Sequence, residues 1–192
     1  MSLTEQDFQN AADRLGVEVA VMKAVKEVES GSYRAFLASG RPPILFEGHI
    51  FWKELKNRGI DPASKQAGNE DVLYEKIARK YLGGEKEYAR LEKAGRIHEE
   101  AALASASWGM FQIIGFNYKV CGAKSVFEFV EKMRRSESEQ LMLLVAYLEN
   151  CCLQVYLKNK DWAGFARKYN GPEYAQNKYD QKLEAAYNKY RS

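Results

Sequence analysis

The sequence predicts a mainly α protein with at most a small β element. Most segments repeat apolar residues at the i, i+3, i+4, i+7 spacing of an amphipathic helix, and several begin at a capping residue and end at glycine. Runs that alternate strictly between apolar and polar residues, as half-buried strands do, are few. The chain has 192 residues, of which 46% are hydrophobic and 29% charged, and this is the size and composition of one globular domain. We therefore expect residues 1–192 to form a single domain.

The two N-terminal helices carry clear start and stop signals. Thr4 and Asp7 have the spacing of a capping box, and Gly16 marks the end of the helix that they begin. A second helix is expected over residues 18–29, because its valines and alanines fall on one face, and Gly31 ends it.

The next segment is expected to be extended. Proline at positions 42 and 43 removes two backbone donors and keeps the preceding residues out of the helical region. Residues 44–46 are therefore expected to form a short strand or a buried lead-in, residues 49–56 a helix, and the polar residues 57–69 a loop.

The rest of the chain is again expected to be helical. Asp161 is a candidate N-cap, and residues 107–116 suggest a buried turn at a helix end. Helices are expected over residues 71–81, 85–94, 99–106, 125–133, 138–156, 162–169 and 174–190.

Charge and hydropathy exclude several classes of protein. The net charge is +3, and residues 153–192 carry eight Lys and Arg against four Asp and Glu, which suits an anionic partner such as a cell-wall polymer, nucleic acid or lipid surface. The mild net charge and the lack of a reading motif argue against nucleic acid. The longest apolar run, residues 141–148, is too short for a membrane span, which needs about 20 residues. The first ten residues lack a basic region and an apolar core, so we expect no signal peptide and synthesis in the cytoplasm.

The three cysteines do not suit a disulfide framework. Cys121, Cys151 and Cys152 are odd in number and two of them are adjacent, so we expect reduced thiols. Cys151 and Cys152 follow an apolar stretch and are expected to be small core residues.

Two glutamates are candidates for acid–base chemistry. Glu29 ends an apolar helix, where burial would raise its pKa toward the range of a general acid. The alternative for Glu29 is a solvated last-turn glutamate like Glu27. Glu47 follows the apolar residues 44–46 and is the best candidate for a second carboxylate, as glycoside hydrolysis often uses a pair. The alternatives for Glu47 are a structural salt bridge or a helix N-cap, and His49 could orient its carboxylate.

Two further segments suit a sugar ligand. In residues 107–112, Ser-Trp-Gly-Met-Phe-Gln, glycine permits a close backbone approach, and Gln112 offers both a donor and an acceptor. The turn Tyr169-Asn170-Gly171 lies in a chain with 12 Tyr and 3 Trp, which supply rings that stack on sugars, although most aromatic residues belong to a core.

These motifs, in this order, resemble the lysozyme-like superfamily, including soluble lytic transglycosylases and goose-type lysozymes. The sequence is most similar to the phage-endolysin N-acetylmuramidase family, almost end to end from about residue 20 to residue 190. The matching runs are AVKEVESG (24–31), GRPPILFEGH (40–49), ASWGMFQIIGFNY (106–118) and DWAGFARKYNGP (161–172).

The resemblance implies a lysozyme-like fold and an enzyme that degrades bacterial cell walls. It implies that Glu29 is the catalytic acid that cleaves the β-1,4 bond from N-acetylmuramic acid to N-acetylglucosamine, with Glu47 as the second catalytic candidate. The candidate substrate-binding residues are Ser30, His49, Ser107, Gln112, Tyr169 and Asn170. Two alternatives stay open: a lytic transglycosylase that forms 1,6-anhydromuramic acid, and a non-catalytic peptidoglycan-binding protein of the same fold.

The expected partners follow from the same reading. We expect peptidoglycan glycan strands as substrate, no cofactor, no metal, no nucleic acid, a monomer, and no separate wall-binding module. The enzyme is expected to act on the cell wall after release or delivery from the cytoplasm.

Overall fold

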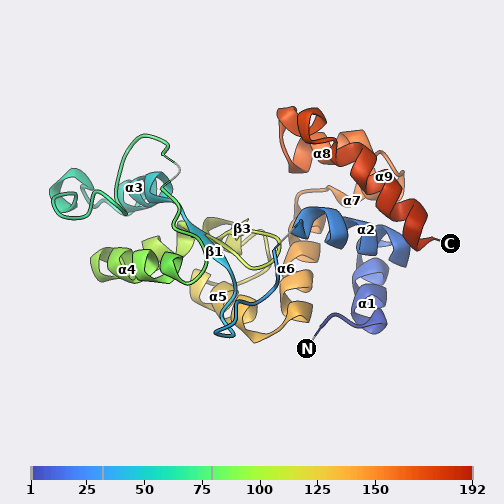
Figure 1. Ribbon diagram of the computed structural model, residues 1–192, viewed down its shortest axis with the longest axis horizontal. Coiled ribbons are helices and arrows are strands. Elements are labelled where there is room, and N and C mark those ends of the chain that lie inside the picture. The colour runs from blue at the N-terminus through green and yellow to red at the C-terminus, as the bar shows by residue number, and fades with distance from the viewer. Residues whose placement is uncertain (1, 32, 79, 192) are drawn as a thin grey trace. The chain divides into compact units, whose positions relative to one another are not determined.

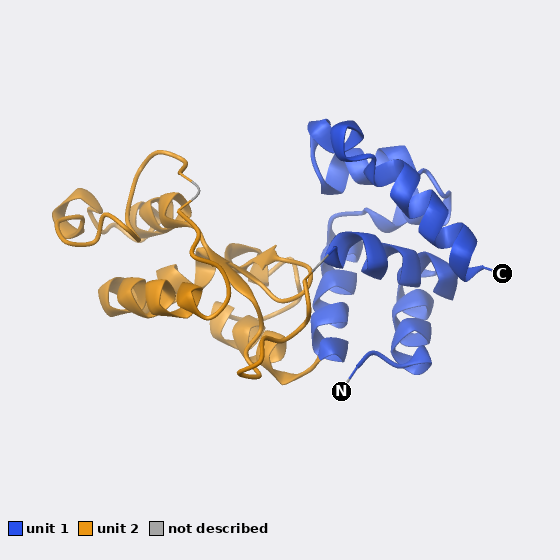
Figure 2. Ribbon diagram, viewed as in Figure 1, with its two compact units in different colours: residues 1–32, 137–192 blue, residues 33–136 orange. Residues whose placement is uncertain are grey.

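The computed structural model describes residues 2–31, 33–78 and 80–191, and these are mainly helical (Figure 1). Two compact units make up the chain: residues 1–32 with 137–192, and residues 33–136 (Figure 2). We call them unit 1 and unit 2. The prediction of a mainly α protein with a small β element is confirmed. The prediction of one catalytic domain over residues 1–192 stays a prediction.

Unit 1 is a group of helices that contains both ends of the chain. Its elements are α1 (Glu5–Leu15), α2 (Val19–Ser30), α6 (Glu137–Asn150), α7 (Gln154–Lys158), α8 (Trp162–Tyr169), the 3-10 helix η3 (Pro172–Asn177) and α9 (Tyr179–Tyr190). Helix α2 packs against α1 and α9, while α1 also packs against α6. The core of unit 1 is filled by aliphatic and aromatic side chains with almost no exposed surface, among them Leu15, Met22, Val25, Leu141 and Phe165.

Unit 2 packs helices around a small antiparallel sheet. Its elements are β1 (Ile44–Phe46), α3 (Gly48–Asn57), η1 (Ala63–Lys65), α4 (Lys86–Ala104), β2 (Ala106–Trp108), β3 (Ile113–Ile114), η2 (Gly115–Tyr118) and α5 (Val126–Arg135). The described strands form one sheet of order β1-β2-β3, in which Leu45 pairs with Ser107, and Ser107 pairs with Ile114. Helix α4 packs against α3, α5 and β1. The buried rings of Phe46, Phe51, Trp108 and Phe129 fill its core.

Local capping signals are confirmed. Thr4 and Asp7 form the complete capping box of α1, and Gly16 ends that helix with φ 65°. The carboxylate of Asp161 accepts a hydrogen bond from the amide of Gly164 and so caps α8. These interactions join residues three or four apart, which is why the sequence shows them.

The helix predicted over residues 71–81 is wrong. Residues 71–78 and 80–81 form a turn, a bend and backbone without regular secondary structure, and residue 79 lies outside the described residues. Side chains take the carbonyls that a helix would use: the guanidinium of Arg90 donates to the carbonyl of Asp71, and the hydroxyl of Tyr74 donates to the carbonyl of Ala78. The donor for Asp71 lies 19 residues away, so helical periodicity cannot reveal it.

Three other predicted boundaries are corrected. The helix expected over residues 138–156 breaks into α6 and α7, because Cys152 adopts φ 56°. The last helix begins at Tyr179 rather than at residue 174, after η3 and the left-handed Lys178. Residue 106 belongs to β2, and residues 107–116 form the β2–β3 hairpin and the start of η2 rather than a turn at a helix end.

The predicted helices over residues 85–94 and 99–106 join into α4, which is kinked at His98. The backbone of His98 is extended (φ −163°, ψ 105°), and its Nδ1 accepts a hydrogen bond from the amide of Ala101. His98 therefore caps the second half of α4 in the manner of an N-cap residue.

The prediction that Cys151 and Cys152 are core residues is wrong. Both are exposed, at the break between α6 and α7, whereas Cys121 is buried. All three cysteines lie in the described part of the chain and none of them is in a disulfide, in agreement with the expectation of reduced thiols.

Gly48, the first residue of α3, is expected to tolerate no larger side chain. A Cβ there would lie 2.3 Å from Cε1 of Tyr74 and 2.7 Å from the carbonyl oxygen of Val72, well inside contact distance. We therefore expect Gly48→Ala to lower the free energy of unfolding by about 1–3 kcal/mol, as overpacking does. Urea denaturation measures this. Gly95→Ala, in the middle of α4 with nothing near its Cβ, is the control and should be neutral or stabilising.

Candidate active site

Glu29 lies in the last turn of α2, where it meets the end of α8 within unit 1. Val21 and Val25 of α2 are buried in the unit, and Gly31, with φ 50°, turns the chain away directly after Ser30. Asn170 is the C-cap of α8, held by a hydrogen bond from its own amide to the carbonyl of Ala166. Its side-chain amide donates to Oε2 of Glu29 at 2.9 Å. The structure thus joins two predicted site residues that lie 141 positions apart.

The Glu29 carboxyl is strongly desolvated. Burial raises the pKa of Glu29 to about 7, and the hydrogen bond from Asn170 opposes that rise. Its Oε1 is buried and has no hydrogen-bond partner among the described residues. Glu27, two residues earlier, differs: hydrogen bonds from Lys189 and Tyr190 lower the pKa of Glu27. A pKa this close to neutrality lets the Glu29 carboxyl hold a proton, which is the state that a general acid requires.

Tyr169, the neighbour of Asn170, lies in an aromatic cluster of unit 1. Its ring stacks on Phe165, with centroids 5.4 Å apart and planes at 10°, and meets the edge of Tyr147 at 6.0 Å. These contacts fix the end of α8 and with it the side chain of Asn170. Ser30 is buried, with 3% of its surface exposed.

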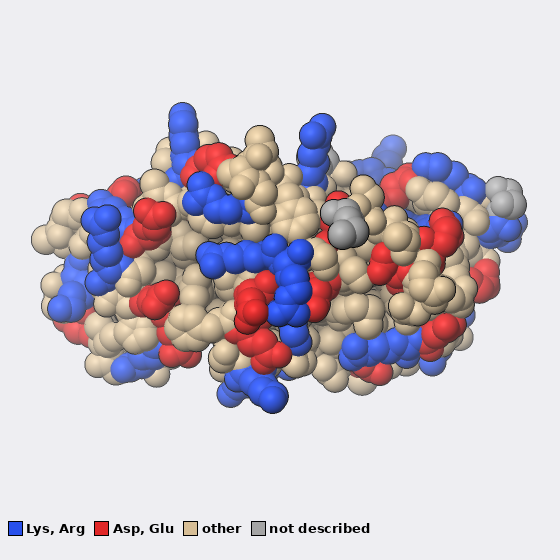
Figure 3. Space-filling model, turned by 90° about the horizontal axis from the view of Figure 1, so that it is seen from below, with Lys and Arg blue, Asp and Glu red and all other residues tan. Residues whose placement is uncertain are grey.

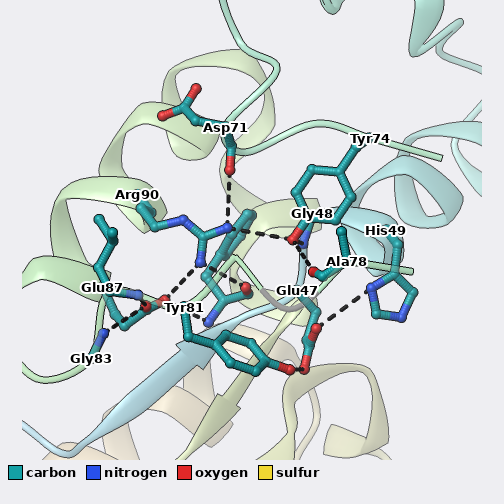
Figure 4. Close-up of polar contacts among 12 residues, drawn as sticks. Glu47, Gly48, His49, Asp71, Tyr74, Ala78, Tyr81, Gly83, Glu87 and Arg90 are labelled. Carbon is teal, nitrogen blue, oxygen red and sulfur yellow. Dashed lines mark hydrogen bonds and ion pairs between the residues drawn. The ribbon is translucent and has the colours of Figure 1, made fainter. Parts of the chain in front are cut away.

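Glu47 lies between β1 and α3 in unit 2, and its carboxylate is bonded to Tyr81 and lies beside His49 (Figure 4). The hydroxyl of Tyr81 donates to Oε1 at 2.5 Å, and Nδ1 of His49 lies 3.5 Å from Oε2. The side chains of Glu47 and His49 are only 16% and 13% exposed. Glu47 occupies the N-cap position of α3, as one alternative expected, but its carboxylate makes no capping hydrogen bond among the described residues.

Sequence reasoning missed Tyr81. The residue falls in the segment wrongly predicted as a helix, and it reaches Glu47 from 34 positions away. No local pattern marks such a contact; only the presence of a tyrosine in a stretch with many charged residues hints at a polar role.

Ser107 lies in β2, the middle strand of the unit 2 sheet, and Gln112 lies in the turn after that strand. Gln112 adopts φ 49° in the β2–β3 turn, and its side-chain amide donates to the carbonyls of Gly109 at 2.7 Å and Pro43 at 3.5 Å. The side-chain NH₂ group of Gln112, which the sequence suggested as a donor to a ligand, therefore donates to the backbone instead. Oε1 of Gln112 is buried and has no hydrogen-bond partner in the described chain.

The predicted site residues divide between the two units. Unit 1 holds Glu29, Ser30, Tyr169 and Asn170, whereas unit 2 holds Glu47, His49, Ser107 and Gln112. Glu29 meets Asn170 in the first, and Glu47 meets His49 in the second. The pairing of Glu29 with Glu47 as two catalytic carboxylates stays a prediction.

Charged side chains of both signs lie on the surface of the protein. Figure 3 shows Lys and Arg interspersed with Asp and Glu on the face drawn. In the basic segment 153–192, Lys160 pairs with Glu18 at 2.6 Å and Lys189 with Glu27 at 2.7 Å, so part of its charge is neutralised. Within the described residues, no group of three or more His, Cys, Asp or Glu side chains is arranged to hold a metal ion. None of the described helices has the length and apolar character needed to cross a bilayer.

Comparison with known proteins identifies the family. The N-acetylmuramidase family profile matches residues 18–191, nearly the whole chain. Among solved structures, the fold is similar to the Burkholderia AP3 phage endolysin, with 43% sequence identity and a TM-score of 0.92 over 98% of this chain and 71% of that one. A search of curated proteins gives no significant match. The chain therefore belongs to the phage-endolysin N-acetylmuramidase family and has the mainly helical fold of these peptidoglycan-degrading enzymes.

Proposed function

We propose that this muramidase cleaves the β-1,4 bond between N-acetylmuramic acid and N-acetylglucosamine, with Glu29 as the general acid. The observation that carries the proposal is the desolvated carboxyl of Glu29, with a pKa of about 7, bonded to Asn170. A protonated carboxyl beside the scissile bond can give its proton to the glycosidic oxygen as the bond to C1 breaks. The aglycone then leaves as an alcohol, and Glu29 becomes a carboxylate.

Glu47 is the proposed second carboxylate. C1 acquires positive charge as the leaving group departs, and a carboxylate can either attack it directly or take a proton from an attacking water. The contacts with Tyr81 and His49 support this role, because they restrict a carboxylate that makes no helix cap. Carboxyls about 5–5.5 Å apart would retain the configuration at C1, and carboxyls about 6.5–9.5 Å apart would invert it.

The lytic transglycosylase route is the second candidate. In that reaction the 6-hydroxyl of the muramic acid attacks its own C1, and Glu29 acts first as acid and then as base. The buried Glu29, with its raised pKa of about 7, supports this route equally well, because the route requires no second carboxylate.

Product analysis distinguishes these reactions. Purified peptidoglycan is digested with the wild type and with Glu29→Gln, the products are reduced with borohydride, and masses are measured. Muramitol ends made only by the wild type support hydrolysis, whereas products lighter by one water that resist reduction support the transglycosylase. Wall binding by both proteins without any products would instead support a non-catalytic binding protein.

The proposal also covers where the enzyme acts. The substrate is the glycan strand of the bacterial cell wall, which the enzyme reaches after release or delivery from the cytoplasm. We also propose that the enzyme is a monomer that needs no cofactor. Analytical ultracentrifugation measures its oligomeric state. Turnover measured without added metal or cofactor tests whether it needs one.

Asn170 is expected to set the pH range of activity. The hydrogen bond from Asn170 stabilises the ionised form of Glu29. Asn170→Ala should therefore raise the pKa of Glu29 from about 7 to a higher value. The alkaline limb of the plot of kcat/KM against pH should then shift to higher pH by about one unit. This shift corresponds to the free energy of one hydrogen bond to a charged group. Asn177→Ala, in the exposed η3, is the control, and a limb that does not move in Asn170→Ala would contradict this role.

A further inference from the structure

The backbone on both sides of Glu47 is fixed by hydrogen bonds from buried groups of unit 2 (Figure 4). The amide of Phe46 donates to Oε2 of Glu87 at 3.0 Å, and its carbonyl accepts from Arg90 at 3.0 Å. On the other side, the amide of Gly48 donates to the hydroxyl of Tyr74 at 3.3 Å. Residues 46–48 therefore have little freedom to move the Glu47 side chain.

The same Glu87 carboxylate also holds the residues that follow Tyr81. Its Oε1 accepts hydrogen bonds from the amides of Leu82 and Gly83, while Oε2 binds Phe46. One carboxylate thus bonds to the residue before Glu47 and to the residue after Tyr81. We call this arrangement, Glu87 with Phe46, Leu82 and Gly83, the Glu87 clamp.

The clamp is buried and its charge is balanced. Glu87 is 0% exposed, and Arg90, which is 4% exposed, pairs with it at 2.9 Å. The guanidinium of Arg90 also donates to the carbonyl of Asp71, and this bond holds the start of the segment that leads to Tyr81. An apolar core would stabilise a fold at least as well as a buried ion pair, whose desolvation is costly. What the ion pair supplies is directional hydrogen bonds, and these end at Phe46 and Leu82, the chain neighbours of Glu47 and Tyr81.

We propose that Tyr81 is a positioning residue of the muramidase reaction, which holds Oε1 of Glu47 through its hydroxyl while the Glu87 clamp sets the distance between them. This inference rests on the proposed function, in which Glu47 is the second catalytic carboxylate. Tyr81 reaches the surface, with 37% of it exposed, so the pair lies where a ligand has access. With Oε1 occupied, Oε2 beside His49 is the oxygen left to attack C1 or to accept the proton of water.

Kinetics of Tyr81→Phe test the proposal on soluble glycan strands of defined length. Loss of the hydroxyl frees the carboxylate to rotate, so kcat should fall about 10-fold, the effect of one hydrogen bond. KM should change less than about two-fold and the melting temperature should stay the same, because the ring and the clamp remain. Tyr187→Phe removes a similar tyrosine–carboxylate bond, to Glu18 at 2.8 Å, and serves as the matched control with unchanged kcat.

A double-mutant cycle separates positioning from other roles. In a Glu47→Gln or Glu47→Asp background, Tyr81→Phe should cost nothing further, because the reacting carboxylate that the hydroxyl orients is absent in the first and one methylene farther away in the second. The aspartate background keeps the cycle measurable if the glutamine variant is very slow. Equal losses from Tyr81→Phe in all backgrounds, or a loss that appears in KM or the melting temperature, would overturn the inference.

The same data separate this inference from the proposed function. Normal turnover by Glu47→Gln would remove Glu47 from the reaction, and so contradict both the proposed role of Glu47 as second carboxylate and the inference that rests on it. A slow Glu47→Gln together with a normal Tyr81→Phe would leave the proposed function intact and overturn only the positioning role.

Discussion

Replacement of Glu29 by glutamine is expected to lower kcat by about 10²–10⁴-fold while making the folded protein more stable at pH 8. The loss of activity follows because an amide cannot give a proton to the glycosidic oxygen. The gain in stability follows because the wild type at pH 8 holds a buried charge, whereas the amide is neutral. If Glu29 only supported the fold, its replacement would lower activity only by unfolding the protein. It would also not make the protein more stable at pH 8.

The pH dependence of that gain has a definite sign. The pKa of Glu29 is about 7 in the folded state and near 4.5 in the unfolded chain, so the folded state holds the proton more tightly. The stability that this proton supplies is complete below about pH 4.5 and is lost as the pH rises to about 7. The Glu29→Gln variant should therefore match the wild type at pH 4 and exceed it at pH 8 by up to about 3 kcal/mol, at 1.36 kcal/mol for each unit of pKa shift.

Thermal or urea denaturation at pH 4 and pH 8 measures the difference. Glu27→Gln is the matched control, on the same helix and two residues away. The pKa of Glu27 is lowered by its bonds with Lys189 and Tyr190, so its replacement should leave turnover unchanged and should not stabilise the protein at pH 8. A Glu29→Gln variant with the same stability difference at both pH values would show that Glu29 is not desolvated.

Glu87→Gln is expected to lower the free energy of unfolding by about 3–5 kcal/mol, because it leaves the guanidinium of Arg90 buried without its counter-charge. The amide also presents an NH₂ group to a site that holds only donors: the backbone amides of Phe46, Leu82 and Gly83, and Arg90. Urea denaturation gives the value. Glu131→Gln breaks an exposed pair with Arg135, spaced i,i+4, and should cost less than about 0.5 kcal/mol.

A double variant tests what the Glu87–Arg90 pair does beyond stability. Glu87→Met with Arg90→Met removes both charges, so part of the stability lost in Glu87→Gln should return. Turnover should stay low, because the clamp that connects Glu47 and Tyr81 is absent. Recovery of both stability and turnover would show that the pair contributes only to the fold.

Local structure was predictable where its causes are local. The capping box at Thr4, the glycine stop at Gly16 and the cap at Asp161 all join residues within four positions, and all three form as expected. The helix predicted over residues 71–81 failed because the donor for Asp71 comes from Arg90, on α4. Likewise, the apolar run of α6 continues past the point where Cys152 turns the chain, so periodicity alone overlooked that break.

For the candidate site, the sequence by itself determined the fold class, the family resemblance and the identity of Glu29, Glu47 and Asn170 as candidates, because motif order and helical periodicity are properties of the chain. The tertiary structure decided that Glu29 is desolvated and that Asn170 bonds to it, since both require α2 and α8 to pack together. It also decided that Glu47 meets Tyr81. Burial and hydrogen bonds between distant residues depend on packing, and these are the interactions that give a carboxyl group its proton affinity and its orientation.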